Sequence, residues 1–166
     1  MLRRKRIALV SLLSVLMGAL FITAVGAETV MIVGHETVDG TPVEPPLPAV
    51  EGLTSGLFAA GHVVFEAGKV GVSARMEDLE EIAREGKVDW LLQINVVYKQ
   101  TKLQQNVTRV VCSATFSLVN AESGSTSLSD KASATNEGRE KSTDRAALGA
   151  ELGRLISTKV AKALAS

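Results

Sequence analysis

The fold of this chain is decided by residues 89–99, Asp89-Trp90-Leu91-Leu92-Gln93-Ile94-Asn95-Val96-Val97-Tyr98-Lys99. Apolar side chains occupy every second position from Leu92 to Tyr98, and polar side chains such as Gln93 and Asn95 fall between them. Successive side chains of a strand point to opposite faces of a sheet, so this alternation predicts a strand with one buried face.

Two further strands are predicted downstream of it. After a polar turn at residues 100–106, a second alternating stretch places Val110, Cys112, Ala114, Phe116 and Leu118 on one face. A turn at residues 120–124 leads to residues 125–135, which alternate weakly and are rich in Ser and Thr. Low apolar content is typical of an edge strand. The three stretches are therefore predicted to form an antiparallel meander.

The remaining elements place this meander in a mixed sheet. The predicted strands are residues 29–35 and 62–66, the predicted helices are residues 49–60, 73–85 (with Ser73 as N-cap) and 144–165, and a loop over residues 37–48 holds all four prolines. The fold class is α/β (α+β), in the order β-α-β-α-β-β-β-α. We expect a single mixed sheet of about five strands, ending in the meander and a long final helix.

The N-terminus has the pattern of an export signal. Four basic residues, Arg3 to Arg6, precede an uncharged run from Ile7 to Ala27, which closes with small residues suited to signal peptidase. We expect cleavage between Ala27 and Glu28, giving a signal peptide at 1–27 and a single domain at 28–166. The alternative is an uncleaved anchor, since roughly 19 residues at about 1.5 Å each nearly span the ~30 Å hydrocarbon core. No cysteine lies near Ala27 for lipid attachment, so soluble release is expected.

Charge and cysteine content narrow the compartment and the partners. Four of the 18 Lys and Arg residues lie in the leader and all 18 Asp and Glu residues lie after it, so the mature chain carries about −4 charges. Without a basic cluster, nucleic acid and anionic membrane surfaces are not expected partners. The single cysteine, Cys112, cannot form an intramolecular disulfide. Export without a disulfide favours a bacterial periplasm.

The sequence predicts no catalytic site, no cofactor-binding site and no metal-binding site. His35, Glu36 and Asp39 lie near one loop. If the first two strands are parallel, His35 ends one and His62 begins the other, so they would lie roughly 16 Å apart along the strand direction, too far to share an ion. Residues 52–56, Gly-Leu-Thr-Ser-Gly, put Thr where a nucleophile elbow needs Ser, and they lie within a predicted helix. Cys112 falls on an apolar face and is interpreted as a core residue. Carboxylates that converge only in the fold would leave an enzyme possible.

Three stretches are considered as partner-binding sites, and one of them, the charged residues 136–143, is interpreted as a solvated loop before the last helix. The first is the Ser/Thr-rich edge strand, whose unpaired backbone groups could accept a partner strand and whose candidate residues are Ser125, Ser127, Ser129, Lys131 and Ser133. Its alternative is an ordinary edge protected by Asp130 and Lys131. The second is the proline-rich loop, where Pro45 and Pro46 could present a polyproline segment or could simply connect two elements.

Two local patterns carry a resemblance to a known family. One is residues 56–65, Gly-Leu-Phe-Ala-Ala-Gly-His-Val-Val-Phe, where a helix ends at glycine and continues into a strand. The other is residues 88–94, Val-Asp-Trp-Leu-Leu-Gln-Ile, followed by the turn Val-Asn-Ala-Glu-Ser-Gly at residues 119–124. With the element order, these patterns resemble bacterial envelope domains of the TolB amino-terminal type, also seen in curli-assembly lipoproteins and lipoprotein activators of penicillin-binding proteins. The lipid-attached cysteine of those lipoproteins and the membrane-inserting strands of the curli family have no counterpart here.

The resemblance implies a non-catalytic role in envelope assembly or regulation. The resulting hypothesis is an exported periplasmic accessory protein that uses no cofactor and binds another envelope protein of a flagellar, secretion or cell-wall assembly. The alternative hypothesis is a periplasmic domain that binds a small molecule or glycan, although one Trp and one Tyr offer little aromatic surface for sugar stacking.

Overall fold

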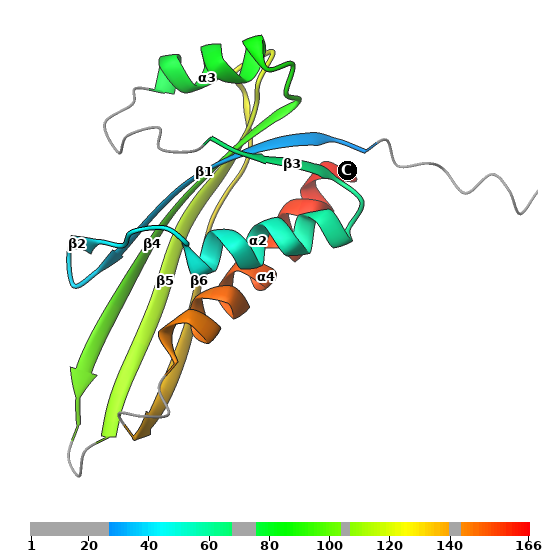
Figure 1. The fold of residues 1–166 in the computed structure, drawn as a ribbon. Coiled ribbons are helices and arrows are strands. Elements are labelled where there is room, and N and C mark those ends of the chain that lie inside the picture. The colour runs from blue at the N-terminus through cyan, green and yellow to red at the C-terminus, as the bar shows by residue number, and fades with distance from the viewer. Residues whose placement is uncertain (1–26, 68–75, 104–106, 140–143) are drawn as a thin grey trace, which may run out of the picture.

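The structure is a computed structural model that describes residues 27–67, 76–103, 107–139 and 144–166. Its elements (Figure 1) are β1 (Thr29–Val38), β2 (Thr41–Pro42), α2 (Pro48–Ala59), β3 (Val63–Glu66), α3 (Met76–Glu85), β4 (Trp90–Lys102), β5 (Val107–Asn120), β6 (Thr126–Arg139) and α4 (Arg145–Leu164). The predicted order of strands and helices is confirmed, with the two-residue β2 as an additional strand.

The strands form one mixed sheet. Its order is β2-β1-β4-β5-β6, and β3 pairs with β1 beside β2. Strand β1 is parallel to β3 and β4, whereas β4, β5 and β6 pair antiparallel as a meander. The predicted mixed sheet with a C-terminal meander is therefore confirmed, and β6 forms one edge of it.

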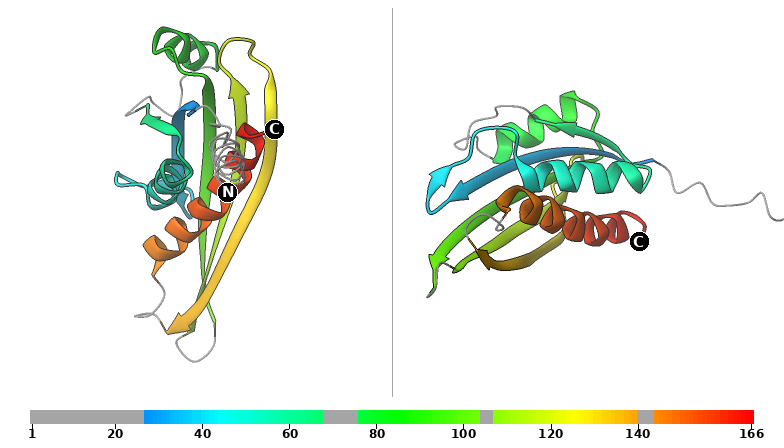
Figure 2. Two further views of the ribbon diagram at one scale, coloured as in Figure 1. Left: turned by 90° about the vertical axis from the view of Figure 1, so that its right-hand side faces the viewer. Right: turned by 60° about the horizontal axis from the view of Figure 1, so that its bottom comes forward.

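The main core lies between one face of the sheet and the pair α2 and α4 (Figures 1 and 2). The alternation in the sequence explains this face, because the apolar positions of β4 and β5 are the buried ones. The buried core side chains from the sheet include Ile32, Leu92, Ile94, Val96, Phe116 and Leu118, and those from the helices include Leu53, Leu57, Leu152 and Ile156. We call this side the helix-covered face.

The backbones of helices α2 and α4 approach each other closely because glycines line the contact between the two helices. A Cβ atom on Gly153 would collide with the backbone of Ala49 and Leu53, and one on Gly52 would collide with the backbone of Ala150. Such close approach lets two helices fit side by side on a narrow sheet. The 52–56 Gly-x-x-x-Gly segment is therefore a packing motif of α2.

The opposite face of the sheet is covered differently. Helix α3 packs Leu79 and Ala83 over one end of this face, against Met31, Leu91 and Val119. Figures 1 and 2 show α3 at the end of the sheet, away from α2 and α4. Among the described residues, the rest of this side faces outward, and we call it the open face.

Several predicted boundaries are wrong in an informative way. Strand β1 extends to Val38, three residues beyond its predicted end at His35, because Glu36 and Val38 continue the inward positions of Val30 and Ile32. The proline-rich segment 37–48 accordingly loses Thr37 and Val38 to β1, and it contains β2. Strand β4 runs on to Lys102, beyond the predicted turn at residue 100.

The end of β6 is a second correction. Residues 136–139, predicted as a charged loop, pair with β5 residues 107–110. Backbone pairing and the Arg109–Glu137 ion pair stabilise a strand there, although the segment is almost wholly polar. The start of the helix predicted at Ser73 lies outside the described residues, and α3 is described from Met76.

Candidate functional site

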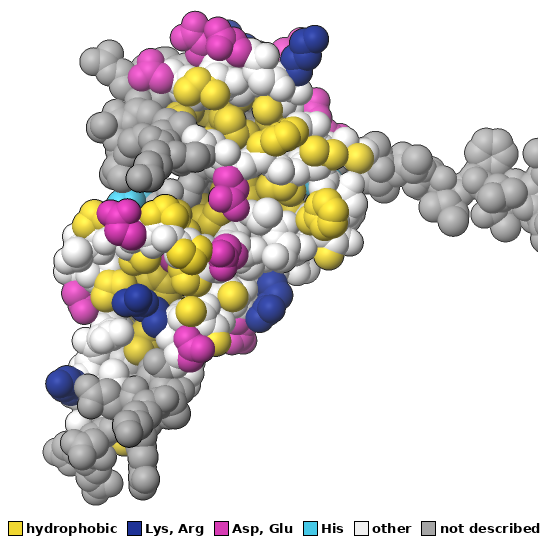
Figure 3. Space-filling view, viewed as in Figure 1, with side chains coloured by type: hydrophobic (Ala, Val, Ile, Leu, Met, Phe, Trp, Pro, Cys, Tyr) yellow, Lys and Arg dark blue, Asp and Glu magenta, His cyan; other side chains and the backbone are white. Residues whose placement is uncertain are grey.

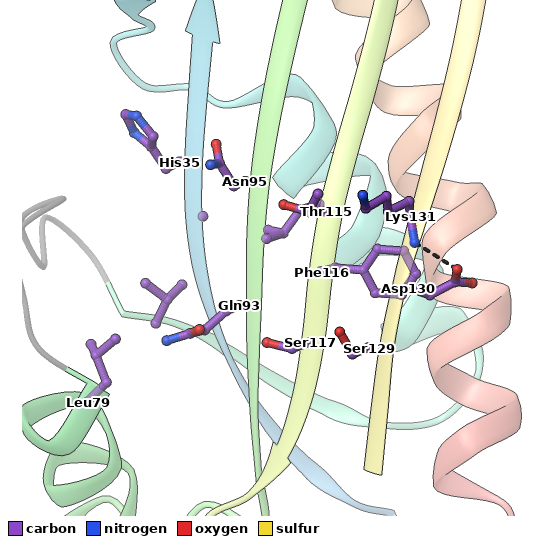
Figure 4. Close-up of a pocket in the computed structure, with 13 residues that line it drawn as sticks. His35, Leu79, Gln93, Asn95, Thr115, Phe116, Ser117, Ser129, Asp130 and Lys131 are labelled. Atoms are coloured by element: carbon purple, nitrogen blue, oxygen red, sulfur yellow. Dashed lines mark hydrogen bonds between the residues drawn. The ribbon is translucent and has the colours of Figure 1, made fainter. Parts of the chain in front are cut away.

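The open face carries a broad depression of about 750 Å³ beside α3. It continues into a second depression of about 440 Å³, which shares Asn95, Thr115 and Lys131 with the first. Four strands and Leu79 of α3 line the larger one (Figure 4). The two depressions follow the open face from α3 toward the far end of the meander.

Strand register arranges the lining residues in rows across the sheet. One row consists of His35, Asn95, Thr115 and Lys131, which are direct neighbours on β1, β4, β5 and β6. A second row, two residues nearer α3, consists of Val33, Gln93, Ser117 and Ser129. Because side chains alternate between faces, most polar positions of the predicted meander fall on this side. Sequence alternation and register together therefore create the site.

The chemistry of the rows is mainly that of hydroxyl and amide groups. Lys131 and His35 are the titratable side chains in them, and they lie at opposite ends of one row, about 14 Å apart over three inter-strand steps. Asp130 points to the other side of β6, where its carboxylate accepts a hydrogen bond from Lys159 at 2.6 Å. That bond is the main cause holding the pKa of Asp130 below its usual range. The rows offer many hydrogen-bond donors and acceptors and no paired acid and base.

The structure brings together only part of the predicted binding residues. Ser129, Lys131 and Ser133 line the depressions, and Ser127 lies nearby at the bulge of β6. Ser125 is in the exposed turn before β6, where its hydroxyl bonds to that of Ser123. Pro45 and Pro46 are exposed in the loop after β2, at the opposite edge of the sheet. The two predicted surfaces are therefore separate.

His35 is a functional candidate that the sequence prediction misplaced. The sequence predicts His35 at the end of the first strand, facing the proline-rich loop, whereas it lies half-buried within β1 and lines the larger depression. The prediction ends the strand too early because residues 35–37 are polar. His62 is buried before β3, and its Nδ1 has no hydrogen-bond partner among the described residues. In the described ranges, no three His, Cys, Asp or Glu side chains come together to hold a metal ion.

A buried polar cluster on the helix-covered face was also missed. The fully buried Glu36 carboxylate accepts hydrogen bonds from the Tyr98 hydroxyl at 2.7 Å and from the backbone N–H of Ala49 at 2.9 Å and Val50 at 3.2 Å. The last two donors belong to the first turn of α2, which has no side-chain cap from Leu47. Glu36 thus attaches the start of α2 to β1 and β4.

Burial dominates the electrostatics of this cluster. It raises the pKa of Glu36 despite the three donated hydrogen bonds, and it raises the pKa of Cys112 to about 12. The pKa of Tyr98 is raised by burial and by the nearby Glu36 carboxylate. The Arg145 guanidinium lies 5.9 Å from the Tyr98 ring centroid. Since these groups face α2 and α4, they hold the fold together and are not part of the open site.

Exposed apolar side chains lie elsewhere on the molecule. Phe58 on α2 is 74% exposed, and Val63 and Phe65 on β3 are also exposed. Figure 3 shows hydrophobic side chains over this region and acidic side chains gathered over α3. Isolated apolar side chains are normal on protein surfaces and do not by themselves define a site.

The leader lies outside the described residues, which begin at Ala27. The first described residues are tied to the sheet, because Glu28 accepts a hydrogen bond from the Trp90 indole at 3.2 Å and the Thr29 N–H donates to Asp89 at 2.8 Å. The expected cleavage point between Ala27 and Glu28 is thus immediately before the folded domain. Within the described ranges, no helix combines the length and apolar character needed to cross a bilayer.

Solved structures with similar folds come from bacteria. Lipoprotein GNA1162 from Neisseria meningitidis is 19% identical, with a TM-score of 0.51 over 80% of this chain and 98% of that chain. PelC from Paraburkholderia phytofirmans, solved as a dodecamer, is 18% identical, with a TM-score of 0.54 over 80% and 87%. The protein CT253 from Chlamydia trachomatis is 12% identical, with a TM-score of 0.59 over 84% and 98%.

These likenesses define the class of the fold. At such identities they establish a shared architecture, and the lipoprotein among them confirms the predicted resemblance to bacterial envelope α/β domains at the level of the fold. No protein-family model matches the chain, and a search of curated proteins finds no match.

Proposed function

We propose that this chain is an exported, non-catalytic accessory protein of the bacterial periplasm that binds another envelope protein across the open face of its sheet. The observation that carries the proposal is the pair of polar rows on β1, β4, β5 and β6, which remain outward while the other face is buried under α2 and α4. The leader pattern and the likeness to an envelope lipoprotein fold support the compartment.

The shape and chemistry of the face suit a protein partner. Small-molecule pockets are usually concave and mainly apolar, with a few convergent polar groups. Here the depression is broad, and hydroxyl and amide side chains dominate its two central rows. A non-obligate protein interface is about as polar as ordinary surface and carries many hydrogen bonds. The partner would belong to a flagellar, secretion or cell-wall assembly, as the resemblance implies.

The second candidate function is binding of a small molecule or glycan in the larger depression. The observation that favours it is the volume of about 750 Å³ beside Leu79, with His35 and Lys131 at the two ends of one row. A ligand with a carboxylate or phosphate could reach Lys131. Titration calorimetry with envelope glycans and small anions would separate this function from the first.

The decisive experiment is site-directed photocrosslinking in the native host. A photoreactive residue at Asn95 or Thr115 reports on the open face, and one at Ser55, exposed on α2, is the matched control. We expect one dominant envelope protein to crosslink at Asn95 and Thr115 but not at Ser55. Equal crosslinking at all three positions, or none, would contradict the proposal. Mass spectrometry of the same sample reads the mature N-terminus, and we expect it at Glu28.

A further inference from the structure

Strand β6 has a backbone edge whose direction can be derived residue by residue. The Leu103 N–H donates to the Val107 carbonyl and the Ala121 N–H donates to the Asp89 carbonyl. These bonds show that odd-numbered residues of β5 bond to β4, so even-numbered residues of β5 bond to β6. In β6, residues 130, 132, 134, 136 and 138 are therefore the ones that bond back to β5. The N–H and C=O groups of residues 129, 131, 133, 135 and 137 point out of the sheet.

Of these outward-pointing backbone groups, only those of Lys131 form hydrogen bonds with side chains in the described part of the same chain. The Lys131 N–H donates to Asp130 Oδ1 at 2.7 Å, and Lys159 Nζ donates to the Lys131 carbonyl at 3.4 Å. Both contacts agree with the outward direction derived above. Within the described residues, the outward backbone groups of Ser133 and Thr135 bond to nothing. Figure 2 shows β6 as the outermost strand, with α4 on the helix-covered side of the sheet.

We propose that this edge pairs antiparallel with β6 of a second copy of the chain, about a two-fold axis at Ala134. In this register Ser133 lies opposite Thr135 of the second copy, and their outward backbone groups exchange hydrogen bonds twice, once on each side of the axis. Lys131 lies opposite Glu137 of the second copy. The two sheets become one, and their open faces continue into each other on the same side.

Charge complementarity selects both the occupant and the register. Lys131 and Glu137 are on the open face of the same strand with opposite charge, so β6 is complementary to itself only when these two residues meet. A two-fold axis at Lys131 would oppose two lysines, and one at Ser133 would pair Lys131 with a threonine. Like charges directly opposite each other destabilise a strand pair, whereas opposite charges stabilise it.

The side chains on the helix-covered face also fit this register. Ala134 lies opposite its own copy and Ala132 lies opposite Asn136, so the strands meet through small side chains beside α4. Asp130 lies opposite Gly138, which has no side chain. The Asp130–Lys159 pair can therefore stay in place while the two edges pair.

Sedimentation velocity tests the proposal on protein purified from the envelope of cells that express the full chain, at concentrations from about 1 to about 100 µM. We expect a dimer. Thr135→Pro removes an outward N–H that the monomer does not use and should raise the dissociation constant about 30-fold, because two symmetric hydrogen bonds are lost. The matched variant Thr135→Ala keeps the N–H and should dimerise as the parent does. Circular dichroism checks that both variants fold.

Charge exchange tests the register. Lys131→Glu and Glu137→Lys should each weaken the dimer about tenfold or more at low salt, and the double variant should restore it. Arg109→Ala removes the partner of Glu137 within the chain and should leave the dimer intact. A protein that stays monomeric overturns the proposal, as does a dimer unaffected by Thr135→Pro or a double variant no better than the single ones. Crosslinking at Asn95 to another envelope protein is independent of these outcomes, so the two proposals can fail separately.

Discussion

Removal of one buried hydroxyl should measure how strongly the polar cluster holds the helices to the sheet. Tyr98→Phe keeps the ring, its packing and its contact with Arg145, and it deletes only the donor that lies 2.7 Å from Glu36. The buried carboxylate then loses one of its three donors. We expect the free energy of unfolding to fall by about 2 kcal/mol, the usual cost of leaving a buried polar group short of a partner.

The assay is chemical and thermal unfolding followed by circular dichroism. A loss of about 2 kcal/mol corresponds to a decrease in Tm of roughly 8 °C for a domain of this size. Thr115→Val, which removes an exposed hydroxyl from the open face, is the matched control and should change stability by less than about 0.5 kcal/mol. A double-mutant cycle with Glu36→Leu, which removes the acceptor, isolates the pairwise energy. Coupling indistinguishable from zero would refute the role given to this hydrogen bond.

Three further predictions concern the helix-covered face. Because burial raises the pKa of Glu36 in the folded state, its contribution to stability should be complete below about pH 4.5, the ordinary value, and should decline as the pH rises through the folded pKa. The unfolding free energies of the parent and of Glu36→Gln should therefore diverge with pH across this range. Parallel curves would contradict the raised pKa. Gly153→Ala should lower the unfolding free energy by about 2 kcal/mol, despite a gain of about 1 kcal/mol in helix propensity, because its Cβ meets the Ala49 backbone; a more stable variant would show that the helices can separate. Cys112, buried with a pKa of about 12, should react with a thiol reagent at pH 8 only after unfolding, and rapid labelling of the folded protein would argue against its burial.

The sequence was most informative where hydrophobic periodicity was strong. Alternation in residues 89–99 predicted β4 and its buried face, and the stripe from Leu148 to Leu164 predicted α4, because burial of one face is the main determinant of such elements. Prediction failed where backbone pairing rather than side-chain burial defines the element. Residues 136–139 form part of a strand because they pair with β5, and no local sequence pattern predicts this pairing.

Glu36 shows a different limit of sequence reasoning. A carboxylate at an inward position of a strand contradicts the apolar pattern, so β1 was predicted to end before it. Its stabilising partners, Tyr98 and the first turn of α2, are 62 and 13 residues away in the chain, and only the fold brings them together. Two signals are present in the sequence: Glu36 keeps the two-residue spacing of Val30 and Ile32, and Pro48 marks a helix start that needs an acceptor.

The candidate site was predictable in composition but not in extent. Ser129, Lys131 and Ser133 were identified on the edge strand, yet their neighbours Asn95 and Thr115 belong to rows that only strand register defines. His35 joins the same row through parallel pairing of β1 with β4, across 60 residues of sequence. Local patterns cannot supply such a neighbour, because residues in one row share no sequence spacing.

The two faces of the sheet should differ in how well they tolerate substitution. On the helix-covered face, backbone contact between glycines and a buried carboxylate leave little freedom to substitute a residue without a loss of stability. On the open face, the row from Asn95 to Lys131 consists of exposed side chains that the fold does not require, so substitutions there can alter the surface at little cost to the domain. A fold of this kind can therefore retain its architecture at sequence identities below 20% while the side chains of its open face change.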